Sequence, residues 1–240
     1  MLEVTAVPVL TDNYVWLIHN GKTGETAAVD PSVADPVLDA VAKKGWSLTQ
    51  VLNTHWHPDH TGGNLAIKQA TGARISGPAG ERIPARDVIL SEGSEVRLGD
   101  HVGRVIEVPG HTLDHLAIIF DRERLAFVGD TMFAMGCGRL FEGTPAQMYN
   151  SLQRLASLPD DTKLYCAHEY TLSNARFAVH AEPQNAATAA RLADVDRLRA
   201  AGKITVPTTV AQERETNPFV RATDEHAFAR LRKDKDSFRS

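Results

Sequence analysis

The sequence predicts an α/β (α+β) fold in which helices cover β-sheets and a helical region follows them. Strand and helix signals alternate as far as His168, and helix-forming residues dominate after it. Sheets and their covering helices form one layered core, to which a purely helical segment can be added. The 240 residues are enough for one full core and a smaller unit. We therefore expect two domains, residues 1–170 and 171–240.

Short β-branched runs bounded by turn residues predict the strands. In chain order these are Leu2–Val9, Tyr14–His19, Thr26–Val29, Gln50–Asn53, Ala73–Ser76, Glu95–Leu98, Gly103–Val108, His115–Phe120, Leu125–Val128 and Lys163–Cys166. Three helices are expected between them. Ala34–Lys44 ends at Gly45, Gly63–Ala70 ends before Gly72, and Pro145–Ser157 precedes the last strand.

Helix-forming residues fill the C-terminal region. Ala, Arg, Leu and Glu dominate Asn174–Ala201, which we expect to be helical with a break at Glu182-Pro183. Two shorter helices are expected at Thr209–Glu215, stopped by Asn217-Pro218, and at Asp224–Lys233. Strand signals do not return, so this region is predicted to be all-helical.

Composition excludes several classes of protein. Hydrophobic residues make up 42% and charged residues 23%, as in ordinary globular enzymes. A net charge of -4 predicts no nucleic-acid partner. No apolar run could cross a membrane, and the N-terminal residues lack a secretory-signal pattern. Cys137 and Cys166 are too few for a disulfide scaffold. We expect a monomeric, cytoplasmic enzyme with two reduced thiols.

Three histidines and an aspartate lie within six residues after the apolar strand Val51-Leu52. Burying so many ionisable side chains is costly unless they bind something. His55 and His57 are two apart, so in extended chain they point the same way and can share a metal. Asp59 and His60 follow the turn at Pro58 and can serve a second metal.

Further ligand types follow three later strands. His111, Asp130 and His168 each lie just past a strand end, where binding loops commonly gather. Seven nitrogen and oxygen ligands, one carboxylate bridging, suit two divalent ions about 4 Å apart, as two-metal hydrolases require. The alternative is a histidine-rich loop that binds metal structurally or incidentally, but several strand-end motifs would then have to coincide by accident.

Two other polar residues lie near this cluster. Asp30 could fix the tautomer of a ligand histidine, or could simply be a turn or cap residue before the helix. His115 lies close to the His111 loop, and a structural role is favoured for it.

The motifs HWHPDH, GHT, GDT and AHE, in this order, resemble the metallo-β-lactamase superfamily. The resemblance covers about the first 170 residues and implies an αββα sandwich with the metals at one edge. A narrower resemblance spans the whole chain. It rests on Thr11–Tyr14, Gly136–Gly143, Cys166–Thr171, Thr216–Phe219 and Lys233–Phe238, which together are similar to glyoxalase II, also called hydroxyacylglutathione hydrolase.

The resemblance implies a role for each matching residue. His55, His57 and His111 would bind the first metal, Asp59, His60 and His168 the second, and Asp130 would bridge them. Asp59 could also orient the nucleophile. Two divalent ions are implied, zinc first, with iron or manganese as alternatives. The implied reaction is hydrolysis of S-(2-hydroxyacyl)glutathione, above all S-D-lactoylglutathione, by metal-activated hydroxide. It would serve methylglyoxal detoxification.

The resemblance also implies a glutathione site at Arg139, Phe141, Tyr170, Arg232 and Lys235. The chain departs from the family pattern at two of these positions. Arg139 replaces the lysine of some members, which keeps the charge but changes the donor geometry. Phe141 replaces a tyrosine, so a hydroxyl contact can be lost. Arg232 and Lys235 are three apart and share a helix face, a spacing that suits two carboxylates.

Three other functions compete with this prediction. A persulfide dioxygenase of the same superfamily would use one iron, and it would be expected to lack the full helical region and the Arg-x-x-Lys pair. A metal-dependent nuclease would need a basic surface, which this composition does not provide. A non-enzymatic metal-binding module would close the coordination shell against water.

Overall fold

The computed structural model describes residues 1–80 and 82–239 and confirms the mixed α/β class. The chain divides into two compact units. Unit 1 comprises Met1–Glu107 and Asp114–Gly129, and unit 2 comprises Val108–Leu113 and Asp130–Ser240. The boundaries of the two compact units differ from those of the predicted domains, 1–170 and 171–240. The division into those domains stays a prediction based on the sequence.

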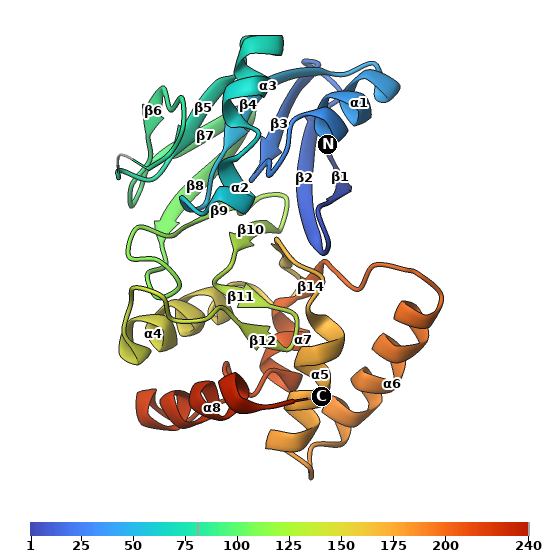
Figure 1. The fold of residues 1–240 in the computed structure, drawn as a ribbon, viewed down its shortest axis with the longest axis vertical. Helices are drawn as coiled ribbons and strands as arrows, with labels where there is room; N and C mark the ends of the chain where they lie inside the picture. The colour runs from blue at the N-terminus through green and yellow to red at the C-terminus, as the bar shows by residue number, and fades with distance from the viewer. Residues whose placement is uncertain (81, 240) are drawn as a thin grey trace. The chain divides into compact units, whose positions relative to one another are not determined.

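The first sheet of unit 1 changes from antiparallel to parallel along its width. Its strands, in spatial order, are β1 (Leu2–Val9), β2 (Asn13–Asn20), β3 (Glu25–Val29), β4 (Ser47–Leu52), β5 (Arg74–Gly77) and β6 (Val88–Ile89). From β3 onward the strands pair in parallel. Parallel neighbours need a crossover, which α1 (Asp35–Lys44) and α3 (Asn64–Thr71) supply (Figure 1).

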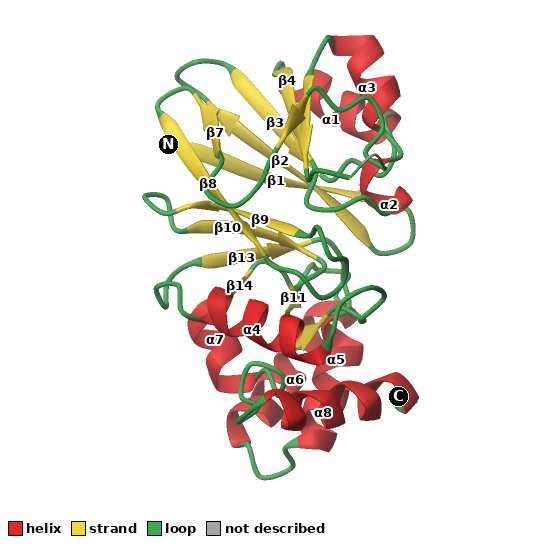
Figure 2. Ribbon diagram, turned by 90° about the vertical axis from the view of Figure 1, so that its left-hand side faces the viewer, coloured by secondary structure: helices red, strands yellow, loops and turns green. Residues whose placement is uncertain are grey.

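Unit 1 also contains an antiparallel sheet of β10 (Leu125–Gly129), β9 (Leu116–Phe120), β8 (His101–Glu107) and β7 (Glu95–Leu98). Every residue of β9 and β10 is buried. The first sheet has a core on each face. Val15 and Leu17 of β2 pack with α1 and α3, and Ile18, which follows Leu17, is buried on the opposite face. Nearby, Asn20 Nδ2 donates to Leu98 O at 3.0 Å, so the two sheets of this unit adjoin (Figure 2).

Unit 2 is mostly helical. Its helices are α4 (Pro145–Ala156), α5 (Thr171–Ala181), α6 (Ala186–Ala200), α7 (Val210–Thr216) and α8 (Glu225–Ser237). Two strand pairs accompany them: β11 (Met132–Phe133) with β12 (Gly136–Cys137), and β13 (Lys163–Cys166) with β14 (Thr208–Thr209). Capping boxes at Thr144 and Thr209 start α4 and α7 by bonding otherwise unpaired backbone N–H groups.

Most predicted elements are present with small shifts at their ends. The break at Glu182-Pro183 is confirmed, since α5 ends at Ala181 and α6 begins at Ala186. The expectation that strands stop after His168 is wrong, because β14 pairs with β13. This strand, β6, β11 and β12 have two residues each, too few to show an alternating pattern in the sequence. Among the described residues, no helix has the length and apolar character needed to span a membrane.

Candidate metal centre

The loop after β4 brings two histidines of unit 1 together. His55 Nε2 lies 3.1 Å from His57 Nδ1, which confirms that the two side chains point the same way. His55 is fully buried, and the Thr54 hydroxyl lies 3.1 Å from its Nδ1. A partner at Nδ1 fixes the ring so that Nε2 can act as a metal ligand.

The short helix α2 (Pro58–Thr61) carries the next two predicted ligands. Pro58 starts it, as proline commonly does at the first helical position. The Nε2 atom of His60 lies 3.5 Å from Asp59 Oδ2. Asn13 Nδ2 donates to the same carboxylate oxygen at 3.1 Å. Asn13 belongs to the Thr11–Tyr14 motif, but that motif predicted no specific role for it.

Asp30 is buried and contacts two residues of this histidine-rich segment, Thr54 and His60. Its carboxylate accepts hydrogen bonds from Thr54 N at 2.7 Å and Thr54 Oγ1 at 2.6 Å, and it lies 3.1 Å from His60 Nδ1. Asp30 thus contacts His60, one of the predicted ligands, and its role in orienting a metal-bound histidine stays a prediction. The residue adopts a φ of 52°, a conformation uncommon for a residue with a side chain. Such strain persists where surrounding contacts enforce it, often at functional sites.

His115 is fully buried in unit 1, where its ring stacks on that of His55 with 4.6 Å between centroids. It offers packing support to a predicted ligand, in line with the structural role expected for it.

Unit 2 brings together His111, Asp130 and His168, all of them buried. The Nε2 atoms of His111 and His168 each lie 3.4 Å from Asp130 Oδ2. Ligands about 2.1 Å from a tetrahedral ion are about 3.4 Å apart. The donor types and spacing therefore fit a carboxylate oxygen that shares one ion with each imidazole.

The backbone fixes the orientation of His111. Its Nδ1 lies 2.9 Å from the carbonyl oxygen of Arg139, an acceptor that favours the proton on Nδ1 and leaves Nε2 for a metal. The backbone at Gly138 passes very close to Asp130 and His111. A Cβ added to Gly138 would lie 2.0 Å from Asp130 O and 3.1 Å from His111 Nδ1, so the position requires glycine.

Two predicted substrate residues contact the predicted histidine ligands of unit 2. The Tyr170 ring stacks on His168, with centroids 4.6 Å apart and planes inclined by 5°. The Phe141 ring meets His111 edge-on at 5.2 Å and remains 62% exposed. An exposed aromatic ring beside a predicted ligand histidine can contact a bound molecule.

The three predicted cations of the glutathione site differ in environment. Arg139 has a side chain 70% exposed. Lys235 Nζ donates to Ser173 O at 2.9 Å, and burial, followed by the nearby Arg232 charge, lowers the pKa of Lys235 to about 8. The Arg232 side chain is only 7% exposed, and its guanidinium donates to Cys137 O at 3.1 Å and Asp236 Oδ1 at 2.8 Å. Direct substrate contact by Arg232 stays a prediction.

Neither cysteine has the properties of a nucleophile. Burial raises the pKa of Cys137 to about 11 and that of Cys166 to about 12, so both remain thiols at neutral pH.

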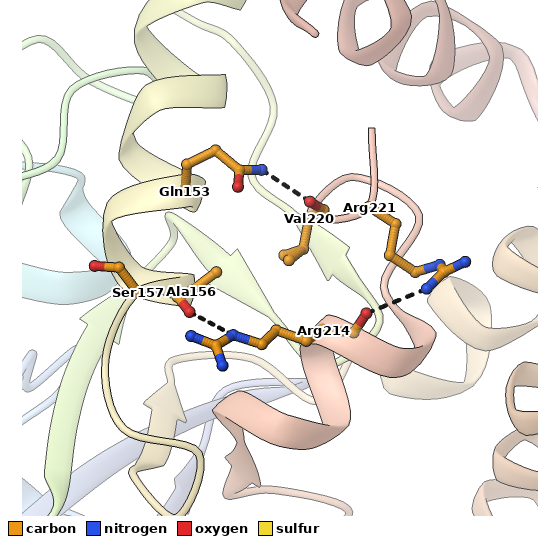
Figure 3. A pocket seen from close by; sticks show the side chains of 6 residues that line it. All are labelled: Gln153, Ala156, Ser157, Arg214, Val220 and Arg221. Carbon is orange, nitrogen blue, oxygen red and sulfur yellow. Dashed lines mark hydrogen bonds between the residues drawn. The ribbon is translucent and has the colours of Figure 1, made fainter. Parts of the chain in front are cut away.

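A separate cavity of about 490 Å³ lies between α4 and the segment from α7 to Arg221 (Figure 3). Its polar side chains already have partners: Arg214 donates to Ala156 O and Gln153 to Val220 O. None of the predicted ligands lines it.

Two family models together match almost the whole chain. The model described as metallo-beta-lactamase superfamily matches residues 10–168, and the one described as hydroxyacylglutathione hydrolase C-terminus matches residues 169–238.

Two curated relatives match over all or nearly all of their lengths. A hydroxyacylglutathione hydrolase of Methylococcus capsulatus is 51% identical and is covered, like this chain, over 100% of its length. One of Maricaulis maris is 47% identical over 99% of each chain. Among solved structures, ETHE1 from Myxococcus xanthus superposes with a TM-score of 0.76 and 26% identity, over 100% of this chain and 92% of that one. The metallo-β-lactamase fold predicted from the motifs, with its helical C-terminal region, is thereby confirmed.

Proposed function

Because this chain belongs to the hydroxyacylglutathione hydrolase family, we propose that it hydrolyses S-(2-hydroxyacyl)glutathione, S-D-lactoylglutathione first, to glutathione and a 2-hydroxy acid. The observation that carries the proposal is the convergence of His111 and His168 on one oxygen of Asp130. Such a shared carboxylate suits a two-metal hydrolytic site. Tyr170 and Phe141, which contact these histidines, provide aromatic surface for the substrate.

The proposed centre holds two divalent ions, zinc first, with iron and manganese as alternatives. The first ion would be bound by His55, His57 and His111, the second by Asp59, His60 and His168, and Asp130 would bridge them. Support comes from the donor types, from the His55–His57 contact and from the spacing around Asp130. When bound, such ions lower the pKa of a coordinated water and polarise the thioester carbonyl.

The chain's own residues would prepare this chemistry. The Asp30 carboxylate contacts His60 and accepts a hydrogen bond from Thr54, and the Arg139 carbonyl contacts His111. These contacts would orient the ligand nitrogens before an ion binds. Asn13 holds the Asp59 carboxylate, which we propose also orients the attacking water. A thiolate leaves readily, so no strong general acid is required of the protein.

The glutathione moiety is proposed to bind at Arg139, Phe141, Tyr170 and Lys235, with Arg232 supporting them. Exposed Arg139 and the Lys235 ammonium supply positive charge for two carboxylates. Arg232 would act mainly through its hydrogen bond to the carbonyl of Cys137, two residues before Arg139.

Cys137 and Cys166 are buried and are not joined in a disulfide, which suits a reducing compartment, so a cytoplasmic location is part of the proposal. The monomeric state and the lack of a nucleic-acid partner stay predictions.

A metal count combined with two activity assays tests the function. We expect about two metal ions per chain and rapid loss of the S-D-lactoylglutathione thioester without oxygen uptake. One iron per chain with oxygen consumption on a glutathione persulfide would instead establish the dioxygenase alternative. Bound metal without either activity would indicate a metal-binding module.

A further inference from the structure

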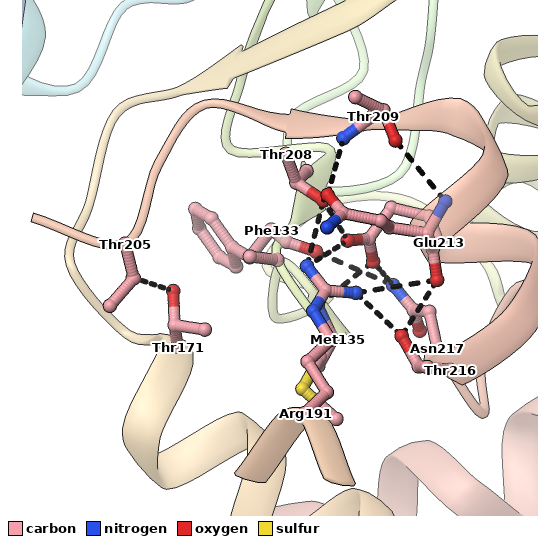
Figure 4. A network of polar contacts seen from close by, with 12 residues as sticks. Phe133, Met135, Thr171, Arg191, Thr205, Thr208, Thr209, Glu213, Thr216 and Asn217 are labelled. Atoms are coloured by element: carbon pink, nitrogen blue, oxygen red, sulfur yellow. Dashed lines mark hydrogen bonds and ion pairs between the residues drawn. The ribbon is translucent and has the colours of Figure 1, made fainter. Parts of the chain in front are cut away.

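A fully buried carboxylate in unit 2, that of Glu213 on α7, is the centre of a polar network that the metal site does not include (Figure 4). Its Oε1 accepts from Arg191 Nη2 at 2.7 Å and from Thr208 Oγ1 at 2.6 Å. Its Oε2 accepts from Met135 N and Asn217 Nδ2, both at 2.8 Å. These four donors, one of them the charged Arg191 guanidinium, compensate the desolvation of the carboxylate.

The network is bonded to the backbone of the β11–β12 hairpin. Met135, at the turn, has a φ of 58° and donates its N–H to Glu213. Asn217 Nδ2 also donates to Gly136 O at 2.9 Å and to Phe133 O at 3.3 Å. Two strand residues on each side cannot hold a hairpin in place alone. The network therefore helps to position the hairpin, together with the bonds from Asn174 Nδ2 to Ala134 O and from Arg232 to Cys137 O.

The opposite side of the hairpin faces the proposed site. The Phe133 ring meets Tyr170 edge-on at 5.2 Å and His168 at 5.9 Å. Directly after β12, Gly138 donates its N–H to Thr131 O, and the chain reaches Arg139. The hairpin thus lies between the Glu213 network and two proposed substrate residues, Tyr170 and Arg139.

We propose that Glu213 is a positioning residue, whose four hydrogen bonds hold the β11–β12 hairpin so that Tyr170 and Arg139 are placed for the glutathione moiety. The inference rests on the proposed function. A carboxylate suits the task because each oxygen accepts two bonds in fixed directions, which an apolar side chain of equal volume cannot do.

The test compares Glu213→Gln with Glu215→Gln, which makes the same charge change on the same helix at an exposed position. Glutamine keeps the shape but aims an NH₂ group at two of the four donors. For Glu213→Gln we expect a KM for S-D-lactoylglutathione about tenfold higher, because a small shift of the hairpin misplaces Tyr170 and Arg139. The kcat and the bound metal should be nearly unchanged. Calorimetric binding of S-methylglutathione should weaken by a similar factor. Glu215→Gln should match the parent chain in every measurement.

A merely structural role predicts a different result. Destabilisation alone would lower the melting temperature and the active fraction, and so kcat, but the folded molecules would keep the parent KM. That outcome would overturn the proposal. If Glu213→Gln does not fold, Asn217→Ala removes the bonds to Phe133 O and Gly136 O and decides by the same KM criterion. If the parent chain binds S-methylglutathione but does not hydrolyse S-D-lactoylglutathione, the proposed function is refuted. The binding comparison between the parent chain and Glu213→Gln would then still decide the role of Glu213.

Discussion

At the scale of single residues, Asp130 is the group on which unit 2's two predicted histidine ligands converge. Asp130→Ala should lose bound metal and activity together. We expect kcat/KM to fall by more than about a hundredfold, because about a hundredfold is the largest loss usually seen when a residue that only supports a metal ligand is replaced. Metal analysis and thioester hydrolysis measure this. Asp194→Ala, which removes an exposed carboxylate on α6, is the control and should change neither. Two bound ions and full activity in Asp130→Ala would refute the bridging role.

Lys235 predicts a pH dependence of substrate affinity. Its pKa is lowered to about 8, chiefly by burial, so its positive charge is lost as pH rises through that value. The KM for S-D-lactoylglutathione should therefore increase between about pH 7 and pH 9. Lys235→Ala should have a raised KM throughout, without this increase, and should hydrolyse simple thioesters lacking glutathione normally. A parent KM that is flat over this range would contradict the assignment.

The same pKa shift predicts an effect on stability. Between about pH 8 and 10.5 the unfolded chain holds a proton on Lys235 that the folded chain has released, so this group makes folding more favourable as pH rises through that window. Below about pH 8 both states are protonated and the cost of the buried charge is fully present. Lys235→Met should therefore be at least as stable as the parent at pH 7 in denaturant unfolding. It should also lack the parent's gain in stability between pH 8 and 10.5. A marked loss of stability at pH 7 would contradict this reasoning.

At the scale of elements, the segment after the β11–β12 hairpin is limited by close backbone approach. Gly138→Ala would place a methyl group 2.0 Å from Asp130 O, against backbone that cannot move without displacing the proposed bridge. We expect reduced metal content and a loss of activity of about a hundredfold or more. Gly21→Ala is the matched control, because a Cβ there meets nothing within 4 Å. Normal metal content in Gly138→Ala would show that the segment can shift without consequence.

At the scale of the whole molecule, the seven predicted ligands are divided between the two compact units: His55, His57, Asp59 and His60 in unit 1, and His111, Asp130 and His168 in unit 2. Ions that bind only the folded chain stabilise it by mass action. Removing metal with a chelator should lower the melting temperature by about 5 to 10 °C, the effect of a ligand at a hundred times its Kd.

Scanning calorimetry before and after dialysis measures this shift. Zinc should restore the melting temperature, whereas calcium at the same concentration should not, because calcium prefers oxygen ligands to imidazole. An unchanged melting temperature in the metal-free chain would contradict a shared metal centre.

The long elements and the identity of the candidate ligands can be predicted from local sequence patterns. Strands such as Leu2–Val9 and the break at Glu182-Pro183 follow from local alternation and from turn residues, and HWHPDH concentrates its ligands within six positions. Each of these signals is complete within a short stretch of chain.

Which side chains come into contact depends on the folded chain and cannot be predicted from these local patterns. No local sequence pattern reveals that His111 and His168 approach Asp130, or that Arg232 is buried. The same is true of the hydrogen bond from Met135 N to Glu213, which joins residues 78 positions apart. Two-residue strands such as β11 and β12 show no periodicity, and they form because distant side chains bond their backbone. Ligand types can therefore be read along the chain, whereas their orientation depends on long-range hydrogen bonds that exist only once the chain has folded.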